Sequence, residues 1–265
     1  MNSGRIEDGV HIPDRMDLGY LAWIKYVAER LRPALPYEPP IDTVVILGSG
    51  LNSFADEFPL ENRTVISEAE IGLPSGSHVE GHNDKIVMGK TSTGKKILAR
   101  SRNIHSYNGN PQGVETSWGV FTPQQAATGY LDVLDAIGVR NIILSCAAGG
   151  LANPRFPGHP PIFPRIPEIT IIGSDINFAY PSTLLGGHLG LGKEKRFPNL
   201  RESDRNLIDE FNASLKRIHN MPPAAEHTYC TSPSTPGYEN RAQAHFAANL
   251  LYRLVGMSFS PEAEN

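Results

Sequence analysis

Apolar residues along the chain recur either at helical spacing or in short continuous runs. From Gly19 to Leu31 they return every three or four positions, which predicts a helix that Pro33 and Pro36 end. The run Thr43–Leu47 is rich in β-branched residues and is typical of a central parallel strand. Further strands are predicted at residues 63–66, 85–88, 96–99, 142–144, 169–172, 227–230 and 255–259, and helices at residues 124–137, 204–219 and 242–254. Alternating strands and helices predict one α/β domain with a mixed central sheet flanked by helices.

The segments between these elements are rich in polar residues, glycine and proline. Residues 1–17 are polar and are expected to form a disordered tail, so the domain would span residues 18–265. A Ser-Thr-Gly turn at 92–94 predicts a hairpin between its two flanking strands. Loops are expected over residues 110–123, 153–168 and 173–199.

Two of the predicted strands end in very small residues. The run Ile142–Leu144, expected to be a buried strand, leads through Ser145 and Cys146 into Ala-Ala-Gly-Gly at 147–150. Thr43–Leu47 leads into Gly-Ser-Gly at 48–50, followed by a helix start with an Asn or Ser cap at 52–53. Small residues let backbone N–H groups approach an anion, and a helix N-terminus adds positive potential. The Gly-Ser-Gly turn is neither a dinucleotide fingerprint nor a Walker loop, and an ordinary strand-to-helix connection is the alternative.

Composition, charge and cysteine content exclude several classes of protein. The chain has 265 residues, 40% of them hydrophobic, and a net charge of -4, which gives no indication of a nucleic-acid partner. Its two cysteines, Cys146 and Cys230, form no disulfide framework and no Cys-x-x-Cys pair. We find no secretory signal and no apolar run near the ~18 residues that a membrane span needs. A soluble cytoplasmic protein is expected.

Eight short motifs together resemble the trimeric purine nucleoside phosphorylases and the related enzymes that cleave methylthioadenosine. The motifs, which keep the family's order from about residue 20 to residue 262, are Ile-Leu-Gly-Ser-Gly-Leu (46–51), Val-x-Gly-His (79–82), His-x-Tyr-x-Gly (105–109), Ala-Ala-Gly-Gly-Leu (147–151), Arg-Phe-Pro (196–198), Tyr-Glu (238–239), Val-Gly-Met-Ser (255–258) and Pro-Glu (261–262). No single motif is specific for this family, but the occurrence of all eight in the family's order is. The resemblance implies a glycosyltransferase of purine salvage that uses phosphate to split a purine nucleoside.

The family reaction is reversible attack of phosphate on C1′ of the nucleoside, through a transition state that resembles an oxocarbenium ion. Products are the free base and ribose 1-phosphate, or deoxyribose 1-phosphate from a deoxynucleoside. The resemblance assigns phosphate binding to Ser49, His82, His105, Ala147 and Ser258. For the two histidines, the alternative is a structural role in a loop.

The remaining assignments concern the nucleoside. Tyr107 would contact the sugar, with Met257 against its face, and Tyr238 would stack on the base. Glu239 would hydrogen-bond the N1–H edge of the purine, which favours inosine and guanosine. His105 and Glu239 are therefore the expected catalytic residues. The resemblance implies no metal and no organic cofactor, only inorganic phosphate as co-substrate.

This chain departs from the family pattern at several positions. The family's phosphate-clamping arginine falls at Asn103, and Arg102 stands one place early, which predicts a loss of about 1.5–3 kcal/mol in phosphate binding. The acid and amide expected at 108 and 146 are Asn108 and Cys146. The family also continues past Pro-Glu with a strand and a helix carrying an Asn for the purine N7 and a His for the 5′-hydroxyl. The chain ends at Asn265, so we expect a rate lower by ~10²–10³ without the N7 donor.

Three functions follow from these observations. The first is a purine nucleoside phosphorylase, active on nucleosides such as inosine. The second is a catalytically impaired relative that binds nucleosides or serves as a regulatory subunit, and the third is a hydrolase that uses water in place of phosphate. The resemblance also implies a homotrimer in which an aromatic residue of a neighbouring subunit closes the sugar pocket, with Phe178 and Tyr180 as candidates.

Overall fold

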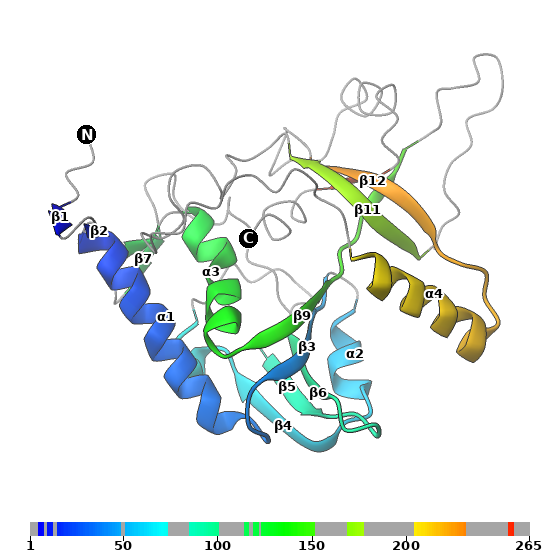
Figure 1. Cartoon of the computed structure of the whole chain (residues 1–265), viewed down its shortest axis with the longest axis horizontal. Helices are drawn as coiled ribbons and strands as arrows, with labels where there is room; N and C mark the ends of the chain where they lie inside the picture. The colour runs from blue at the N-terminus through cyan, green and yellow to red at the C-terminus, as the bar shows by residue number, and fades with distance from the viewer. Residues whose placement is uncertain are drawn as a thin grey trace. The chain divides into compact units, whose positions relative to one another are not determined.

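The chain divides into two compact units, each with its own sheet, and they are described separately. The structure is a computed structural model of the whole chain (Figure 1), and it describes residues 5–7, 10–12, 15–48, 51–73, 85–100, 114–116, 119–121, 123–151, 169–177, 204–231 and 254–256. The first unit comprises residues 1–147, 183–196 and 265, and the second comprises residues 148–182 and 197–264.

The first unit contains a five-stranded mixed sheet and two long helices. Its elements are β1 (Arg5–Glu7), β2 (Val10–Ile12), α1 (Arg15–Ala34), β3 (Ile41–Ile46), α2 (Asn52–Glu57), β4 (Glu61–Ser67), the 3-10 helix η1 (Ala69–Ile71), β5 (Lys85–Lys90), β6 (Lys96–Arg100), β7 (Val114–Thr116), β8 (Gly119–Phe121), α3 (Pro123–Ala136) and β9 (Val139–Leu144). The sheet has the strand order β4-β5-β6-β3-β9. Strand β3 pairs in parallel with both β6 and β9, whereas β5 is antiparallel to β4 and β6. The predicted central parallel strand is therefore confirmed.

The main core lies between one face of this sheet and the helices α1 and α3, which lie side by side (Figure 1). Tyr20 and Trp23 of α1 form a cluster of tilted and edge-on rings with Phe121 at 5.1–5.4 Å between centroids. The Tyr20 hydroxyl donates a hydrogen bond of 2.7 Å to Asp132 of α3. Burial of these large rings stabilises the contact between the two helices. On the other face of the sheet, Leu47, Val87 and Ala99 form a smaller cluster.

The second unit contains a four-stranded sheet and one helix. Its elements are β10 (Gly149–Gly150), β11 (Thr170–Asn177), α4 (Arg205–His219), β12 (Ala225–Thr231) and β13 (Leu254–Gly256). The strand order is β10-β13-β12-β11; β11, β12 and β13 run parallel, and β10 pairs antiparallel to β13. Asp204 is the N-cap of helix α4, and its carboxylate accepts hydrogen bonds from the backbone N–H groups of Asn206 and Leu207. Ile208 and Leu215 are its buried side chains.

The α/β fold class with a mixed sheet flanked by helices is confirmed, and several predicted boundaries are corrected. Residues 110–123 were expected to be a loop, but β7 and β8 form an antiparallel hairpin there and α3 begins at Pro123. The predicted strand 169–172 extends to Asn177, into the expected loop 173–199. Its β-branched residues Thr170, Ile171 and Ile172 pair with β12, and that ladder continues beyond them.

Other differences concern the ends of elements in the first unit. Short strands occur at 5–7 and 10–12 where a disordered tail was expected, and α1 begins at Arg15. Helix α1 also continues past Pro33 to Ala34, because a proline in the last turn removes only one intrahelical hydrogen bond. Helix α2 has Leu51 at its N-cap and no side-chain cap, so the expected Asn or Ser cap is wrong.

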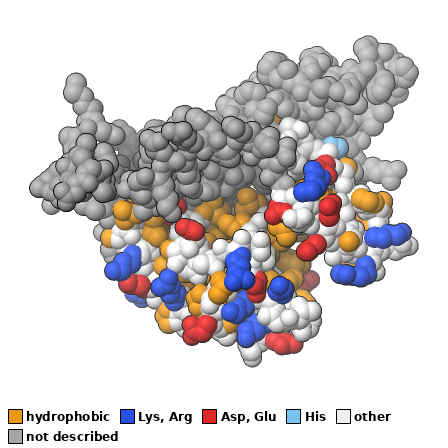
Figure 2. All heavy atoms as spheres, viewed as in Figure 1, with side chains coloured by type: hydrophobic (Ala, Val, Ile, Leu, Met, Phe, Trp, Pro, Cys, Tyr) orange, Lys and Arg blue, Asp and Glu red, His pale blue; other side chains and the backbone are white. Residues whose placement is uncertain are grey.

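Strand β9 is confirmed, but its predicted burial is wrong. Ile142 and Ile143 are 40% and 46% exposed, because β9 lies at the end of the strand order in this sheet. Figure 2 shows acidic and basic side chains interspersed over the visible described surface. Among the described helices, none is long and apolar enough to cross a membrane. The predicted helix 242–254 and loop 153–168 lie outside the described residues, apart from Leu254 in β13.

Candidate functional site

Several strands of the five-stranded sheet end at one of its edges, and the predicted phosphate-binding segments follow these strands. Leu144, Ile46, Arg100, Ile86 and Ile66 stand opposite one another across β9, β3, β6, β5 and β4. The parallel strands β9, β3 and β6 all end at this row, β4 ends there too, and β5 begins there (Figure 1). In sheets with parallel strands, this carboxyl edge is where ligands usually bind.

The ends of β3 and β9 are joined by a close set of hydrogen bonds. Ser145 donates from both its backbone N–H and its hydroxyl to the carbonyl of Ile46, at 3.0 Å each. The backbone N–H of Gly48 donates to the Ser145 hydroxyl oxygen at 3.0 Å. The Leu47 N–H donates to the carbonyl of Arg100 at 2.8 Å, which ties β6 to the same place. These bonds fix the start of the Gly-Ser-Gly turn relative to its two neighbouring strands.

Gly48 lies where no side chain fits. A Cβ atom on this residue would lie 2.8 Å from Cys146 Cα and still closer to the carbonyl oxygen of Ser145. Both neighbours are backbone atoms, which cannot move away as the end of a flexible side chain would. Glycine is therefore required here for close approach of two strand ends.

Of the predicted site residues, the structure describes Ala147. It follows β9 and is exposed, whereas the preceding Ser145 and Cys146 are half-buried. An exposed small residue at the carboxyl edge leaves the backbone accessible to a ligand, and the phosphate-binding role of Ala147 stays a prediction. The other predicted residues lie outside the described part of the chain: Ser49, His82, Arg102, Asn103, His105, Tyr107, Tyr238, Glu239, Met257 and Ser258.

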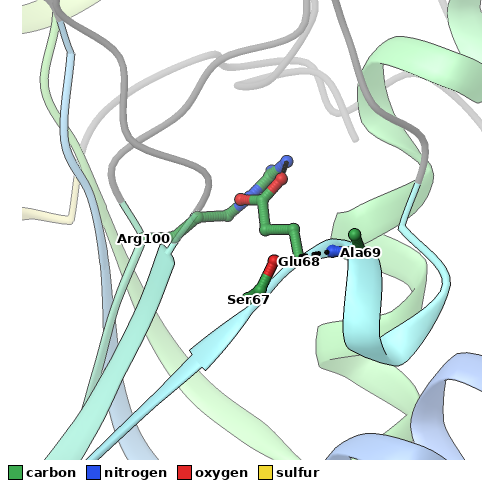
Figure 3. Close-up of polar contacts among 4 residues, drawn as sticks. All are labelled: Ser67, Glu68, Ala69 and Arg100. Atoms are coloured by element: carbon green, nitrogen blue, oxygen red, sulfur yellow. Dashed lines mark hydrogen bonds and ion pairs between the residues drawn. The ribbon is translucent and has the colours of Figure 1, made fainter.

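A buried ion pair at the same edge was not predicted from the sequence. Arg100 Nε donates to Glu68 Oε1 at 2.6 Å and Nη2 donates to Oε2 at 3.3 Å, with side chains 2% and 1% exposed (Figure 3). The guanidinium carbon lies 3.9 Å from the centroid of the Tyr130 ring of α3. One signal was available in the sequence: a charged residue of opposite sign follows each of two predicted strands, Arg100 directly and Glu68 after Ser67.

The sheet of the second unit has a corresponding edge. Asn177, Thr231 and Gly256 stand opposite one another where the parallel strands β11, β12 and β13 end. In sequence, β12 is followed by the segment with Tyr238 and Glu239, and β13 is followed directly by Met257 and Ser258.

Titratable groups with shifted pKa values lie elsewhere in the first unit. The pKa of Tyr20 is raised by burial and by the nearby Asp132 carboxylate. The pKa of Tyr37 is raised by burial and by Asp42. The pKa of Asp42 is lowered, chiefly because its carboxylate accepts the backbone N–H of Lys96 at 2.9 Å. Asp42 is near the beginning of β3, at the opposite end from Gly48. Within the ranges that the structure describes, no group of three His, Cys, Asp or Glu residues is arranged to hold a metal ion.

Comparison with curated proteins finds relatives over most of the chain. Purine nucleoside phosphorylase 1 of Bacillus subtilis (strain 168) is 29% identical over 240 residues, which are 90% of this chain and 78% of the relative. Purine nucleoside phosphorylase 1 of Geobacillus stearothermophilus is 27% identical over 242 residues, 90% of this chain and 77% of the relative. No model of a protein family matches the chain.

Solved structures give the same fold. A Schistosoma mansoni purine nucleoside phosphorylase in complex with BCX-34 matches with a TM-score of 0.67 and 22% identity, over 92% of this chain and 81% of that one. A purine nucleoside phosphorylase in complex with ribose-1-phosphate also matches with a TM-score of 0.67 and 22% identity, over 92% and 82%. Sequence similarity to the curated relatives and the shared fold thus support the resemblance to the purine nucleoside phosphorylases inferred from the ordered motifs.

Proposed function

We propose that this chain catalyses the reversible phosphorolysis of purine nucleosides and deoxynucleosides such as inosine and guanosine. The observation that carries the proposal is the row of strand ends in the first unit. The segments with Ser49, Arg102 to His105, and Ala147 follow β3, β6 and β9 directly, and the segment with His82 precedes β5. Because a chain spans at most ~3.6 Å per residue, these segments are tethered to the row of strand ends, whereas the predicted ligand Ser258 follows β13 of the second unit.

Neutral donors aimed at one place suit inorganic phosphate. In the proposed site, the turn amides after Gly48 and the Ser49 hydroxyl bind phosphate oxygens, together with the Ala147 backbone and Ser258. His82 and His105 supply further donors, and Arg102 adds a positive charge beside Asn103. The close junction of Gly48 with Ser145 supports this arrangement because it fixes two of the contributing backbones.

The second set of residues acts on the nucleoside. Tyr107 and Met257 hold the sugar and Tyr238 stacks on the base, which orients C1′ toward the phosphate. Glu239 accepts a hydrogen bond from the purine N1–H and stabilises the base as it leaves. Phosphate is the co-substrate, and the reaction uses no metal or organic cofactor. A homotrimer located in the cytoplasm belongs to the same proposal.

The test is release of hypoxanthine from inosine by the full 265-residue chain, with and without added phosphate. We expect turnover that saturates with phosphate concentration and falls to background without it. Equal rates with and without phosphate would indicate a hydrolase. Inosine binding by calorimetry with no turnover would indicate a non-catalytic nucleoside-binding relative. Either of these results would overturn the proposed function.

A further inference from the structure

The Glu68–Arg100 ion pair connects three elements at the candidate edge. Glu68 follows β4, Arg100 ends β6, and the Tyr130 ring that packs on the guanidinium belongs to α3. Figure 3 shows both side chains extending toward one another above the ends of their strands. Two hydrogen bonds between the guanidinium and the carboxylate define the relative orientation of these side chains as well as their distance.

A buried ion pair is a poor means of gaining stability. Desolvation of both charges offsets most of their attraction, and apolar side chains of similar volume often stabilise a fold equally well or better. Removing one partner leaves a buried charge and destabilises strongly. The side chains of this pair are only 1–2% exposed. We therefore expect the pair to fix the geometry of the strand ends and not only to add stability.

Arg100 is also bonded through its backbone to the residue that precedes the Gly-Ser-Gly turn at 48–50, the proposed phosphate turn. Its carbonyl accepts the Leu47 N–H at 2.8 Å, and Leu47 directly precedes Gly48. Gly48 in turn donates to Ser145 at 3.0 Å. A shift of Arg100 would therefore move Leu47 and the Gly48–Ser145 junction, where the two backbones lie too close together for a side chain to fit between them.

We propose that Glu68 and Arg100 are positioning residues for phosphate: their ion pair holds the end of β6 so that Leu47 and Gly48 present the phosphate turn correctly. This inference rests on the proposed phosphorolysis. Neither side chain needs to touch the substrate, because the effect travels through the Arg100 carbonyl.

The test compares Glu68→Gln, Arg100→Met and the double variant with the parent chain. Single variants are expected to lower the melting temperature, and the double variant, which leaves no buried charge, to recover most of it. In all three, the KM for phosphate should rise at least tenfold, while the KM for inosine changes less than about twofold. Arg140→Gln is the control, because its ion pair with Asp42 joins β9 and β3 of the same sheet at the opposite edge.

A double variant that recovers both melting temperature and phosphate KM would overturn the proposal, since the pair would then be merely structural. Amide hydrogen exchange gives a readout independent of catalysis. Exchange at Leu47 and Gly48 should accelerate in the double variant and stay unchanged in Arg140→Gln, and no acceleration would also overturn the proposal. If the parent chain shows no phosphate-dependent turnover, the proposed function fails, and hydrogen exchange still decides whether the ion pair positions this edge.

Discussion

Two single residues, Gly48 and Ser145, determine how the ends of β3 and β9 meet. The glycine has no room for a Cβ, and the serine hydroxyl both accepts from Gly48 and donates to Ile46. The small-residue pattern at these positions was visible in the sequence, because two strands end in glycine, alanine and serine. Their hydrogen bonds were not, since they join residues 97 and 99 positions apart.

Gly48→Ala is expected to destabilise the protein and to weaken phosphate binding. The added methyl group must displace the backbone of Ser145 and Cys146, which costs about 1–3 kcal/mol of unfolding free energy. Urea unfolding measures that loss, and steady-state kinetics measure the expected rise in phosphate KM.

Gly94→Ala is the matched control for this prediction. Gly94 has a φ of +80° and no atom within 4 Å of an added Cβ, so the substitution strains the hairpin between β5 and β6 without a collision. It should lower stability but leave phosphate KM unchanged. Equal effects of both variants on phosphate KM would contradict the role assigned to Gly48.

Asp42 gives the first unit a dependence of stability on acid pH. Its lowered pKa means that the folded state favours the carboxylate, so the stabilisation is present above the unfolded pKa of about 3.9 and is lost as pH falls through the folded value. Asp42→Ala should therefore reduce the unfolding free energy by about 1.5 kcal/mol at pH 7. The difference from the parent chain should shrink in urea titrations near pH 3.

Asp56→Ala serves as the control, because Asp56 forms an exposed ion pair with Arg63 at 3.4 Å. Loss of such a surface ion pair should lower the unfolding free energy by at most ~1 kcal/mol. A difference for Asp42→Ala that stays constant from pH 7 to pH 3 would show that its contribution does not depend on ionisation.

At the scale of whole elements, the strands of the first unit were predicted best. The strands predicted at 43–47, 63–66, 85–88 and 96–99 overlap β3, β4, β5 and β6, because their apolar and β-branched residues leave a clear signal in the sequence. The β7–β8 hairpin was missed since its three-residue strands are too short to show alternation. The extension of β11 was missed because Gly173 and Asp175 are poor strand formers, and pairing with β12 overrides that preference.

Helix α4 offers a test of element stability in the second unit. Asp204 at its N-cap accepts two backbone N–H groups, at 2.8 and 3.3 Å. Asp204→Ala should lower the unfolding free energy by about 1 kcal/mol, whereas Asp204→Asn, which keeps an acceptor oxygen, should lose much less. Thermal unfolding of both variants measures the difference, and equal losses would contradict the capping role.

For the molecule as a whole, the order of the motifs predicted the family and the fold class, and sequence and structure comparisons support both. The individual site residues were assigned by motif position, and their roles stay predictions; all except Ala147 also lie outside the described ranges. The Glu68–Arg100 pair could not be predicted, since its residues are 32 positions apart and only the strand register brings them together.

The most direct test of the central claim is the identity of the sugar product. Inosine and inorganic phosphate would be incubated with the purified full chain and followed by ³¹P nuclear magnetic resonance. A new phosphomonoester signal from ribose 1-phosphate is expected to grow in step with hypoxanthine. Hypoxanthine released with free ribose and no new phosphorus signal, or no consumption of inosine at all, would contradict it.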